Sequence, residues 1–306
     1  MLDKISGLHL ELTNMCTLKC PRCPRTNFIE RFPSNWTNIN LNFEHLKNFL
    51  DIDLSGKLID LGGNYGDPIY YDKLFEVIEY FKVQGCYINI STNGSYRSSS
   101  WWNELSILLD SKDTVIFGID GIPDNFTKYR VNADWKSIKL GIEVLSRSPV
   151  RTVWKYIPFS FNEENINQAQ TLSKSLGITE FQISPSNRWI DDHDWLKPET
   201  IFCKDDTANI LSWKSENIRN VDIEPKCLID NNQHFISASG FYMPCCYTGN
   251  HQFYYKTDFY KNKEYYDITK TTISNILSAE KLCKFYSTLM EEKHDYCTFN
   301  CQRISV

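Results

Sequence analysis

Residues 8–23 have the sequence Leu8-His9-Leu10-Glu11-Leu12-Thr13-Asn14-Met15-Cys16-Thr17-Leu18-Lys19-Cys20-Pro21-Arg22-Cys23. Apolar and polar residues alternate over 8–12, which predicts a β-strand. The three cysteines that follow have the spacing C-x3-C-x2-C. A short loop can wrap three thiolates around one metal centre, and soft thiolates favour an iron–sulfur cluster or zinc. Three ligands leave one metal position open, as a catalytic site requires, whereas a structural zinc site would need a distant fourth ligand.

Strand-like and helix-like segments alternate along the first two thirds of the chain. We expect strands at 8–12, 58–61, 87–90, 114–119, 150–157 and 181–183, with helices at 42–54, 71–83, 101–109, 135–145 and 163–176. This alternation predicts parallel strands with helices outside them. Six strands are too few for a complete eight-stranded barrel. We therefore expect an α/β fold, a partial (βα)6 barrel, with functional residues at the C-terminal ends of its strands.

The alternation stops near Trp195. We expect the barrel domain over residues 1–195, a linker over 196–222 and a small α+β domain over 223–306. In the last domain, apolar segments on both sides of Ala238-Ser239-Gly240 predict a β-hairpin. A final helix is expected at about 278–291.

Charge and composition narrow the functional classes. The net charge is −5 and like charges form no long run, so a nucleic-acid partner is not expected. No stretch of eighteen apolar residues exists, and the N-terminus lacks a hydrophobic signal region. We therefore expect no membrane partner and a cytoplasmic location. The 11 cysteines favour metal ligation over a disulfide framework, because the number is odd and the chain is not small.

Polar residues follow successive predicted strands. Gly66 and Asp67 come after the second strand, where glycine permits close backbone approach and the carboxylate is an acceptor. Further polar residues after the third and fourth strands are Ser91, Asn93, Asp120 and Arg130. Short polar side chains at these positions suit a ribose and an amino acid group. The alternative for each is an ordinary structural role: a turn, a helix cap or a surface arginine.

The cysteine loop after the first strand of a βα barrel resembles the radical S-adenosylmethionine (SAM) superfamily over about residues 8–190. The resemblance implies that Cys16, Cys20 and Cys23 hold a 4Fe–4S cluster. It also implies that SAM binds the open iron through its amino and carboxylate groups. Arg22 departs from the family pattern, in which this position is often aromatic or apolar and helps to hold the adenine.

The same resemblance suggests roles for the polar residues at the strand ends. The segment Asn64-Tyr65-Gly66-Asp67-Pro68 looks like a form of the family's glycine-rich turn, which receives the methionine ammonium group. Residues equivalent to Ser91, Asn93 and Asp120 contact the sugar hydroxyls and the carboxylate. Arg130 is similar in place to an arginine that pairs with the carboxylate of the cofactor.

A second cysteine group lies in the last third of the chain. Cys227, Gly240 and Cys245 have the form C-x12-G-x4-C, which resembles the opening of SPASM and twitch auxiliary-cluster domains. A full SPASM domain has more cysteines, so one auxiliary 4Fe–4S cluster is expected, as in twitch domains. We assign its ligands as Cys227, Cys245, Cys297 and Cys301. Cys246 is an alternative ligand, or a thiol that donates a hydrogen atom to a substrate radical. A structural zinc site made by the same cysteines is the other interpretation.

The resemblance implies a radical SAM enzyme of the oxidoreductase type. It would cleave SAM reductively to a 5′-deoxyadenosyl radical and abstract hydrogen from a small-molecule substrate, with oxidation as the favoured outcome. The alternatives are a radical maturase or an epimerase that acts on a peptide. The partners implied are the substrate and a one-electron reductant such as flavodoxin or ferredoxin. The alternative to an enzyme is a zinc-binding structural protein.

Overall fold

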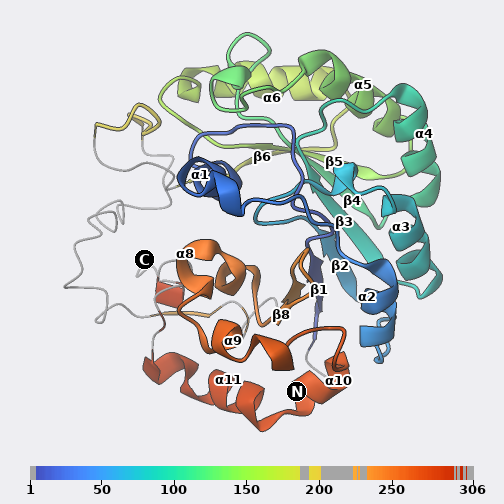
Figure 1. The fold of residues 1–306 in the computed structure, drawn as a ribbon. Coiled ribbons are helices and arrows are strands. Elements are labelled where there is room, and N and C mark those ends of the chain that lie inside the picture. The colour runs from blue at the N-terminus through green and yellow to red at the C-terminus, as the bar shows by residue number, and fades with distance from the viewer. Residues whose placement is uncertain are drawn as a thin grey trace. The chain divides into compact units, whose positions relative to one another are not determined.

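The computed structural model describes residues 5–186, 193–200, 223–225, 227, 233–292, 294, 297–298 and 301 (Figure 1). The chain forms two compact units. The first unit comprises Met1–Met15, Thr37–Tyr87 and Lys214–Val306, and the second comprises Cys16–Trp36 and Ile88–Trp213. The predicted domains over 1–195 and 223–306 stay a prediction. Most of the predicted linker, 201–222, and Cys203 within it lie outside the described residues.

The second unit is built on parallel strands. They are β3 (Tyr87–Thr92), β4 (Thr114–Gly118), β5 (Arg151–Tyr156) and β6 (Glu180–Ile183). They pair in chain order. The helices between them are α4 (Ser99–Leu108), α5 (Trp135–Leu145) and α6 (Ile166–Ser175), which lie on the outer side of these strands in Figure 1. The predicted alternation of strands and helices is therefore confirmed for this part of the chain.

The sheet of the second unit has one face under the helices. Phe117 of β4 and Trp154 of β5 are neighbours in the parallel register and are fully buried on this face. Trp102 of α4 packs on Phe117, with ring centroids 5.6 Å apart. In α5, a Cβ atom at Gly141 would lie 2.5 Å from the Trp102 ring, so the glycine lets the two helices approach closely.

Shorter helical segments complete the second unit. A helix that was not predicted, α1 (Pro24–Arg31), begins directly after Cys23 with a proline in its first turn. The remaining short turns are η2 (Pro33–Asn35), η4 (Phe126–Lys128) and η5 (Glu163–Asn165).

In the first unit, β1 (Gly7–Leu10) is a central strand. It pairs in parallel with β2 (Leu58–Leu61) on one side and with β7 (Gln233–Ile236) on the other. The strand β8 (Tyr242–Met243) pairs antiparallel with β7, which confirms the predicted hairpin. The parallel pairing of β7 with β1 was not predicted. With β1–β6 all present, the predicted α/β fold class is confirmed.

The helices of the first unit begin with α2 (Phe43–Phe49), which Asn42 caps by accepting a hydrogen bond from the His45 amide. The others are α3 (Leu74–Val83), α8 (His251–Tyr254), α9 (Asp258–Lys261), α10 (Ile273–Ser278) and α11 (Glu280–Glu292), with short turns η3 (Pro68–Tyr70), η8 (Cys246–Gly249) and η9 (Lys263–Tyr265). The predicted last helix corresponds to α11. Helices α8–α10 were not predicted, because four to six residues are too few to show a helical period.

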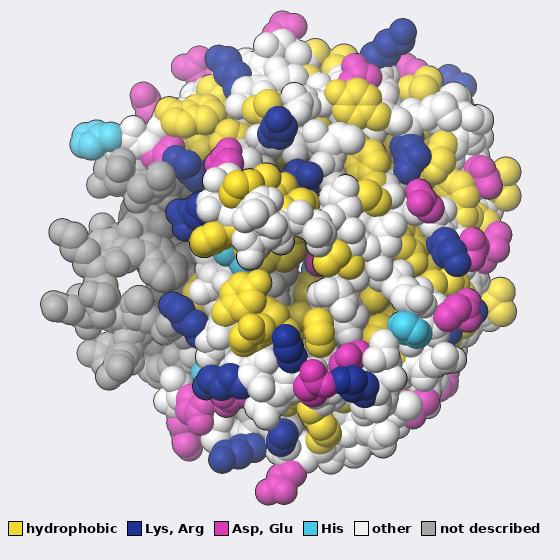
Figure 2. Space-filling view, in the orientation of Figure 1, with side chains coloured by type: hydrophobic (Ala, Val, Ile, Leu, Met, Phe, Trp, Pro, Cys, Tyr) yellow, Lys and Arg dark blue, Asp and Glu magenta, His cyan; other side chains and the backbone are white. Residues whose placement is uncertain are grey.

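The surface is mixed in charge. On the face shown in Figure 2, Lys and Arg side chains are interspersed with Asp and Glu side chains. This distribution agrees with the small net charge of −5. None of the helices in the described part of the chain combines the length and the apolar character that crossing a bilayer requires.

Candidate functional site

The cysteine loop, residues 16–23, belongs to the second unit. Its backbone turns between Cys20 and Cys23, whose amide donates a hydrogen bond to the Cys20 carbonyl at 3.2 Å. Arg22 within this turn has φ +63°, the left-handed conformation that non-glycine residues rarely adopt. The Lys19 amide donates to the Val131 carbonyl at 3.0 Å, which fixes the loop to the segment after β4.

One thiol of the loop is buried and the other two are half-buried. Cys20 is buried with Leu18 in an apolar cluster, and Cys16 and Cys23 pack against it. The buried partners of the cluster are Tyr129, Ile157, Phe159 and Leu196. The structure therefore gathers the three predicted cluster ligands around one apolar region of the second unit.

Asn93 lies next to the first cysteine of the loop. Its Nδ2 atom is 3.6 Å from the Cys16 Sγ atom, which is a hydrogen-bond distance for sulfur. Its Oδ1 atom accepts a hydrogen bond from the Ser95 amide at 2.9 Å, so the side chain is held in one orientation. Gly94 has φ +72°, a conformation that glycine adopts readily and that turns the chain sharply. A Cβ atom at this position would lie 2.9 Å from the Phe117 ring. Asn93 is thus held in a fixed orientation beside Cys16, a predicted cluster ligand.

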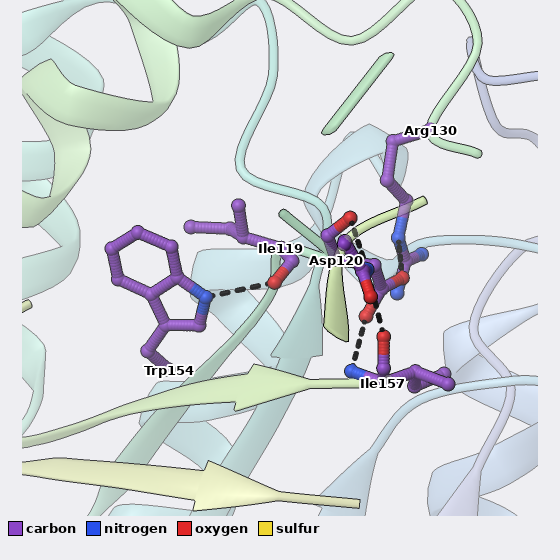
Figure 3. A network of polar contacts seen from close by, with 6 residues as sticks. Ile119, Asp120, Arg130, Trp154 and Ile157 are labelled. Carbon is purple, nitrogen blue, oxygen red and sulfur yellow. Dashed lines mark hydrogen bonds and ion pairs between the residues drawn. The ribbon is translucent and has the colours of Figure 1, made fainter. Parts of the chain in front are cut away.

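Asp120 and Arg130 form a buried ion pair just beyond the end of β4 (Figure 3). The Arg130 Nε atom donates to the Asp120 Oδ2 atom at 2.6 Å, and the Ile157 amide donates to Oδ1 at 2.8 Å. Asp120 is 0% exposed, and 21% of the Arg130 side chain is exposed. Asn162, also buried, donates to the backbone carbonyls of Asp120 and Ile157 at 3.0 Å. Both predicted residues therefore belong to one fixed polar network.

Arg130 also reaches the cysteine loop. Burial opposes the charge of Arg130, but Asp120 and Cys20 together raise its pKa above the usual range. Burial raises the pKa of the Cys20 thiol to about 11, and the positive charge of Arg130 opposes that rise. The predicted arginine thus lies near a predicted cluster ligand. Its placement opposite a cofactor carboxylate stays a prediction.

The face of the sheet opposite the helices carries Ser91, Gly118 and Lys155. In the parallel register Gly118 lies beside Lys155, and alternation places Ser91 on the same face. Ser91 is half-buried and Lys155 is exposed, whereas their neighbours Ile90 and Trp154 are fully buried. A Cβ atom at Gly118 would lie 2.7 Å from the Arg130 Nη2 atom. Glycine at this position therefore makes room for the guanidinium group.

Gly66 and Asp67 belong to the first unit. A Cβ atom at Gly66 would lie 1.7 Å from the Thr13 carbonyl oxygen, so only glycine fits. The Asp67 amide donates to the carbonyl of Met15, the residue before Cys16 in the chain, at 2.9 Å. The buried Asp67 carboxylate caps η3 by accepting a hydrogen bond from the Ile69 amide at 3.2 Å. Asp67 therefore has the structural role that the sequence left open, and its role toward methionine stays a prediction.

Glu11 holds the same turn and was not predicted. Its side chain is buried, and its Oε1 atom accepts a hydrogen bond from the Tyr65 amide at 2.7 Å. Burial raises the pKa of Glu11 to about 7, although backbone amides of the turn oppose the rise. A Cβ atom at Gly63 would lie 2.6 Å from Oε1. The Glu11 carboxylate therefore holds the backbone of the glycine-rich turn and leaves no room for a side chain at Gly63.

The second cysteine group also comes together. Cys227, Cys245, Cys297 and Cys301 all lie in the first unit, and burial together with the neighbouring Cys245 and Cys301 raises the pKa of both Cys227 and Cys297. Burial raises the pKa of Cys227 to about 12 and that of Cys245 to about 11. The Cys301 amide donates to the Cys297 carbonyl at 2.7 Å. The four predicted auxiliary ligands are thus neighbours, although Cys227 and Cys301 are more than 70 residues apart in sequence.

Cys246 and Tyr286 border this group. The Cys246 carbonyl accepts a hydrogen bond from Asn64 Nδ2 at 2.8 Å, and burial, Cys245 and Asp60 raise the pKa of its thiol. Tyr286 of α11 packs with Cys227 and Cys297, and its pKa is raised by burial and by Cys227 and Cys245. Its hydroxyl is buried and has no hydrogen-bond partner within the described part of the chain. An orphaned donor beside thiolates suits a site that is completed by a further acceptor.

Among the described residues, no three side chains of His, Cys, Asp or Glu are placed to hold a single metal ion.

Three residues of these networks were not predicted. Glu11 alternates with the apolar Leu10 and Leu12, and a polar residue in such a pattern gives no sign that it is buried, as Glu11 is here. Asn162 and Asp194 lie in irregular segments, where periodicity carries no signal. Asp194 forms an ion pair with Arg22, whose departure from the family pattern was the only sequence sign of it.

Comparison with known proteins relates these sites to others. No family model matches the chain. The tungsten-containing aldehyde ferredoxin oxidoreductase cofactor-modifying protein of Pyrococcus furiosus is 27% identical over 127 residues. This match covers 38% of the chain and 31% of the length of that relative.

Solved structures resemble almost the whole chain. SuiB of Streptococcus suis bound to SAM has a TM-score of 0.57 at 13% identity, covering 91% of this chain and 71% of SuiB. The protein anSMEcpe with bound SAM and the Cp18Cys peptide has a TM-score of 0.60 at 15% identity, with coverage of 97% and 89%. BtrN in complex with SAM and 2-DOIA has a TM-score of 0.51 at 16% identity, with coverage of 99% and 94%. The chain therefore shares its α/β fold with these three SAM-bound structures.

Proposed function

We propose that the chain is a radical SAM enzyme that cleaves SAM reductively and uses the resulting 5′-deoxyadenosyl radical to abstract hydrogen from a small-molecule substrate. The observation that carries this proposal is the cysteine loop of the second unit. Its Cys16 thiol lies beside Asn93 and its Cys20 thiol near the Asp120–Arg130 pair, at the C-terminal ends of parallel strands. The fold is shared with structures that contain SAM.

Cys16, Cys20 and Cys23 would hold the catalytic 4Fe–4S cluster. The donor set fits, because the three thiols are soft ligands and leave one iron without a protein ligand. Asn93 and Arg130 add hydrogen-bond donors next to Cys16 and Cys20, which suits negatively charged sulfur. When bound, the cluster supplies the electron that breaks a carbon–sulfur bond of the sulfonium.

The polar residues around the loop would hold SAM. Asp120 binds the Nε atom of Arg130 and thereby orients the guanidinium group, which can pair with the carboxylate of the cofactor. Ser91 lies on the same face of the sheet as Gly118, over which Arg130 extends, and would contact the sugar. Gly66 and Asp67 would receive the methionine ammonium group, with Glu11 fixing the backbone of their turn.

The second cysteine group would hold one auxiliary 4Fe–4S cluster, as in a twitch-like domain. Two observations support this assignment: the four thiols lie near one another, and the buried Tyr286 hydroxyl has no hydrogen-bond partner among the described residues. Cys246 is the candidate for a thiol that returns a hydrogen atom to the substrate radical. A Cys246→Ala enzyme that forms an unchanged product at an unchanged rate would remove this role.

Oxidation of the small-molecule substrate, with the auxiliary cluster as electron acceptor, is the favoured outcome, and a protein such as flavodoxin or ferredoxin would supply the reducing electron. Modification of a peptide is the second candidate. The structure of anSMEcpe, which has a similar fold, contains a bound peptide, and this supports a peptide as the alternative substrate. Incubation with both substrate classes, followed by mass spectrometry of the products, separates the two candidates.

The test of the proposal is anaerobic purification followed by iron and sulfide analysis. We expect both elements, and we expect 5′-deoxyadenosine and methionine when SAM and a strong reductant are added. Replacing Cys16, Cys20 and Cys23 together by alanine should abolish 5′-deoxyadenosine formation, whereas the exposed Cys283→Ala control should retain it. Zinc without sulfide would refute the proposal and favour a structural zinc protein.

A further inference from the structure

Residues 193–200, which come after β6 in the chain, pack against the cysteine loop within the second unit. Leu196 is fully buried in the apolar cluster that contains Leu18 and Cys20. Asp194 shapes the segment, because its Oδ1 atom accepts a hydrogen bond from the Leu196 amide at 3.0 Å and its carbonyl accepts one from the Lys197 amide at 2.8 Å. Residues 193–200 therefore form an ordered contact with the cysteine loop.

The far end of this segment is fixed independently of the loop. The Glu163 carboxylate accepts hydrogen bonds from the amides of Glu199 and Thr200, each at 2.8 Å. Trp195 stacks on Phe161 with ring centroids 6.0 Å apart. Since these anchors come from the region after β5, Asp194 is held in place whether or not it has a partner in the cysteine loop.

That partner is Arg22, the residue between Cys20 and Cys23 that departs from the family pattern. The Arg22 Nη2 atom lies 2.7 Å from the Asp194 Oδ2 atom. The Asp194 side chain is 2% exposed and that of Arg22 is 30% exposed. The Nε atom of Arg22 is buried without a hydrogen-bond partner in the described part of the chain. The ion pair with Asp194 thus fixes the Arg22 guanidinium group to residues 193–200.

The backbone of Arg22 needs such an anchor. Its φ of +63° is costly for a residue with a side chain, and such conformations persist where surrounding contacts enforce them. The same residue sets the turn that brings the Cys23 amide to the Cys20 carbonyl. Loss of the ion pair would let the backbone relax out of the left-handed region. The direction of the Cys23 thiol relative to Cys20 would then change.

We propose that Asp194 is a positioning residue for the cysteine loop: through Arg22 it holds the turn between Cys20 and Cys23 in the shape that retains the cluster. This inference rests on the proposed function, because it assumes that the loop carries a cluster. It assigns a role to a residue far from the cysteines in sequence. It also accounts for a charged residue at a position where an apolar one is usual.

The test measures cluster retention, which needs no substrate. The Asp194→Asn protein and the wild type are reconstituted anaerobically, and the loss of iron to an excess chelator is followed by absorbance. We expect Asp194→Asn to lose iron roughly tenfold faster, as expected for loss of a partly buried ion pair. The matched control is Glu180→Gln, which breaks the exposed Arg151–Glu180 pair of the same unit and should change the rate less than twofold.

Substitutions of Arg22 separate the ion pair from the backbone strain. Arg22→Ala removes the pair and keeps a side chain at the left-handed position, whereas Arg22→Gly removes both the pair and the strain. We expect Arg22→Ala to lose iron faster than Arg22→Gly. We also expect Asp194→Asn to add less than twofold to the rate of Arg22→Gly, because both changes act through one contact. Circular dichroism of the cluster-free proteins checks that each variant folds.

The outcomes distinguish the two proposals. If the wild-type protein takes up no iron and sulfide, the proposed function fails. If the wild type carries a cluster and Asp194→Asn releases iron at the rate of Glu180→Gln, the positioning role fails and the function stands. If Asp194→Asn does not fold, equal rates for Arg22→Ala, Arg22→Gly and the wild type would overturn the positioning role.

Discussion

The substitution Asp120→Asn tests the polar network beside the cysteine loop. Asparagine has nearly the shape of aspartate, and its amide oxygen can still accept the hydrogen bond of the Ile157 amide, which lies 2.8 Å from Asp120. The asparagine NH2 group, which takes the place of Asp120 Oδ2, cannot accept the hydrogen bond of the Arg130 Nε atom, which lies 2.6 Å from that oxygen. The substitution therefore removes the ion pair and leaves the rest of the network in place.

The expected loss of stability is about 3 kcal/mol. Removing one partner of a buried ion pair costs about 3–5 kcal/mol, because the other charge stays in the protein without compensation. The lower end of this range applies because 21% of the Arg130 side chain reaches solvent. The double substitution Asp120→Asn with Arg130→Met should recover at least half of the loss, since no uncompensated charge remains.

The assay is urea unfolding of the cluster-free protein, followed by circular dichroism. The control is Glu180→Gln, whose exposed ion pair with Arg151 should contribute less than about 1 kcal/mol. High salt should reduce the effect of the control and leave that of Asp120→Asn nearly unchanged, because burial limits screening. A loss at Asp120→Asn within about 0.5 kcal/mol of the control would refute the argument from burial.

Three further predictions concern single groups. The pKa of Glu11 is about 7 in the folded protein against 4.5 unfolded, so its contribution to stability falls by about 3 kcal/mol as the pH rises from 4.5 to 7; Glu11→Gln should remove this slope in urea titrations between pH 4.5 and pH 8. Tyr286→Phe should leave the cluster-free protein equally stable or up to about 1 kcal/mol more stable, because it removes a buried hydroxyl that has no partner among the residues the structure describes. The same substitution should lower the reduction potential of the auxiliary cluster, measured by a redox titration followed by electron paramagnetic resonance. Gly118→Ala should destabilise the protein by about 1–3 kcal/mol in thermal unfolding, because its Cβ atom would lie 2.7 Å from the Arg130 guanidinium.

The regular elements of the fold could be predicted because their signals are local. The helix at 135–145 and the strand at 58–61 were predicted with the bounds that the structure has, since each has a clear apolar period. The hairpin was predicted from the apolar segments on both sides of Ala238-Ser239-Gly240, and Gly240 at its turn has φ +78°. The predicted helix at 42–54 ends earlier, at Phe49, because the chain turns after Leu50.

The features that could not be predicted depend on contacts between distant residues. The pairing of β7 with β1 joins Gly7 to Gln233, and no local pattern records it. The cysteine spacing predicted the ligands, but it carried no information about Asp194, which lies 172 residues from Arg22. Glu11 was missed for a similar reason, because alternation along a strand does not show that distant residues cover its polar side as well.

The pairing of β7 with β1 has a consequence for biosynthesis. At about 5–20 residues per second, on the order of 10–45 s pass between translation of β1 and translation of β7. During that interval one edge of β1 lacks its native strand and can pair with other chains. All residues of the second unit lie at or before Trp213, so they are synthesised before the last strands of the first unit. Slow or interrupted translation after residue 213 should therefore favour aggregation through the N-terminal strand.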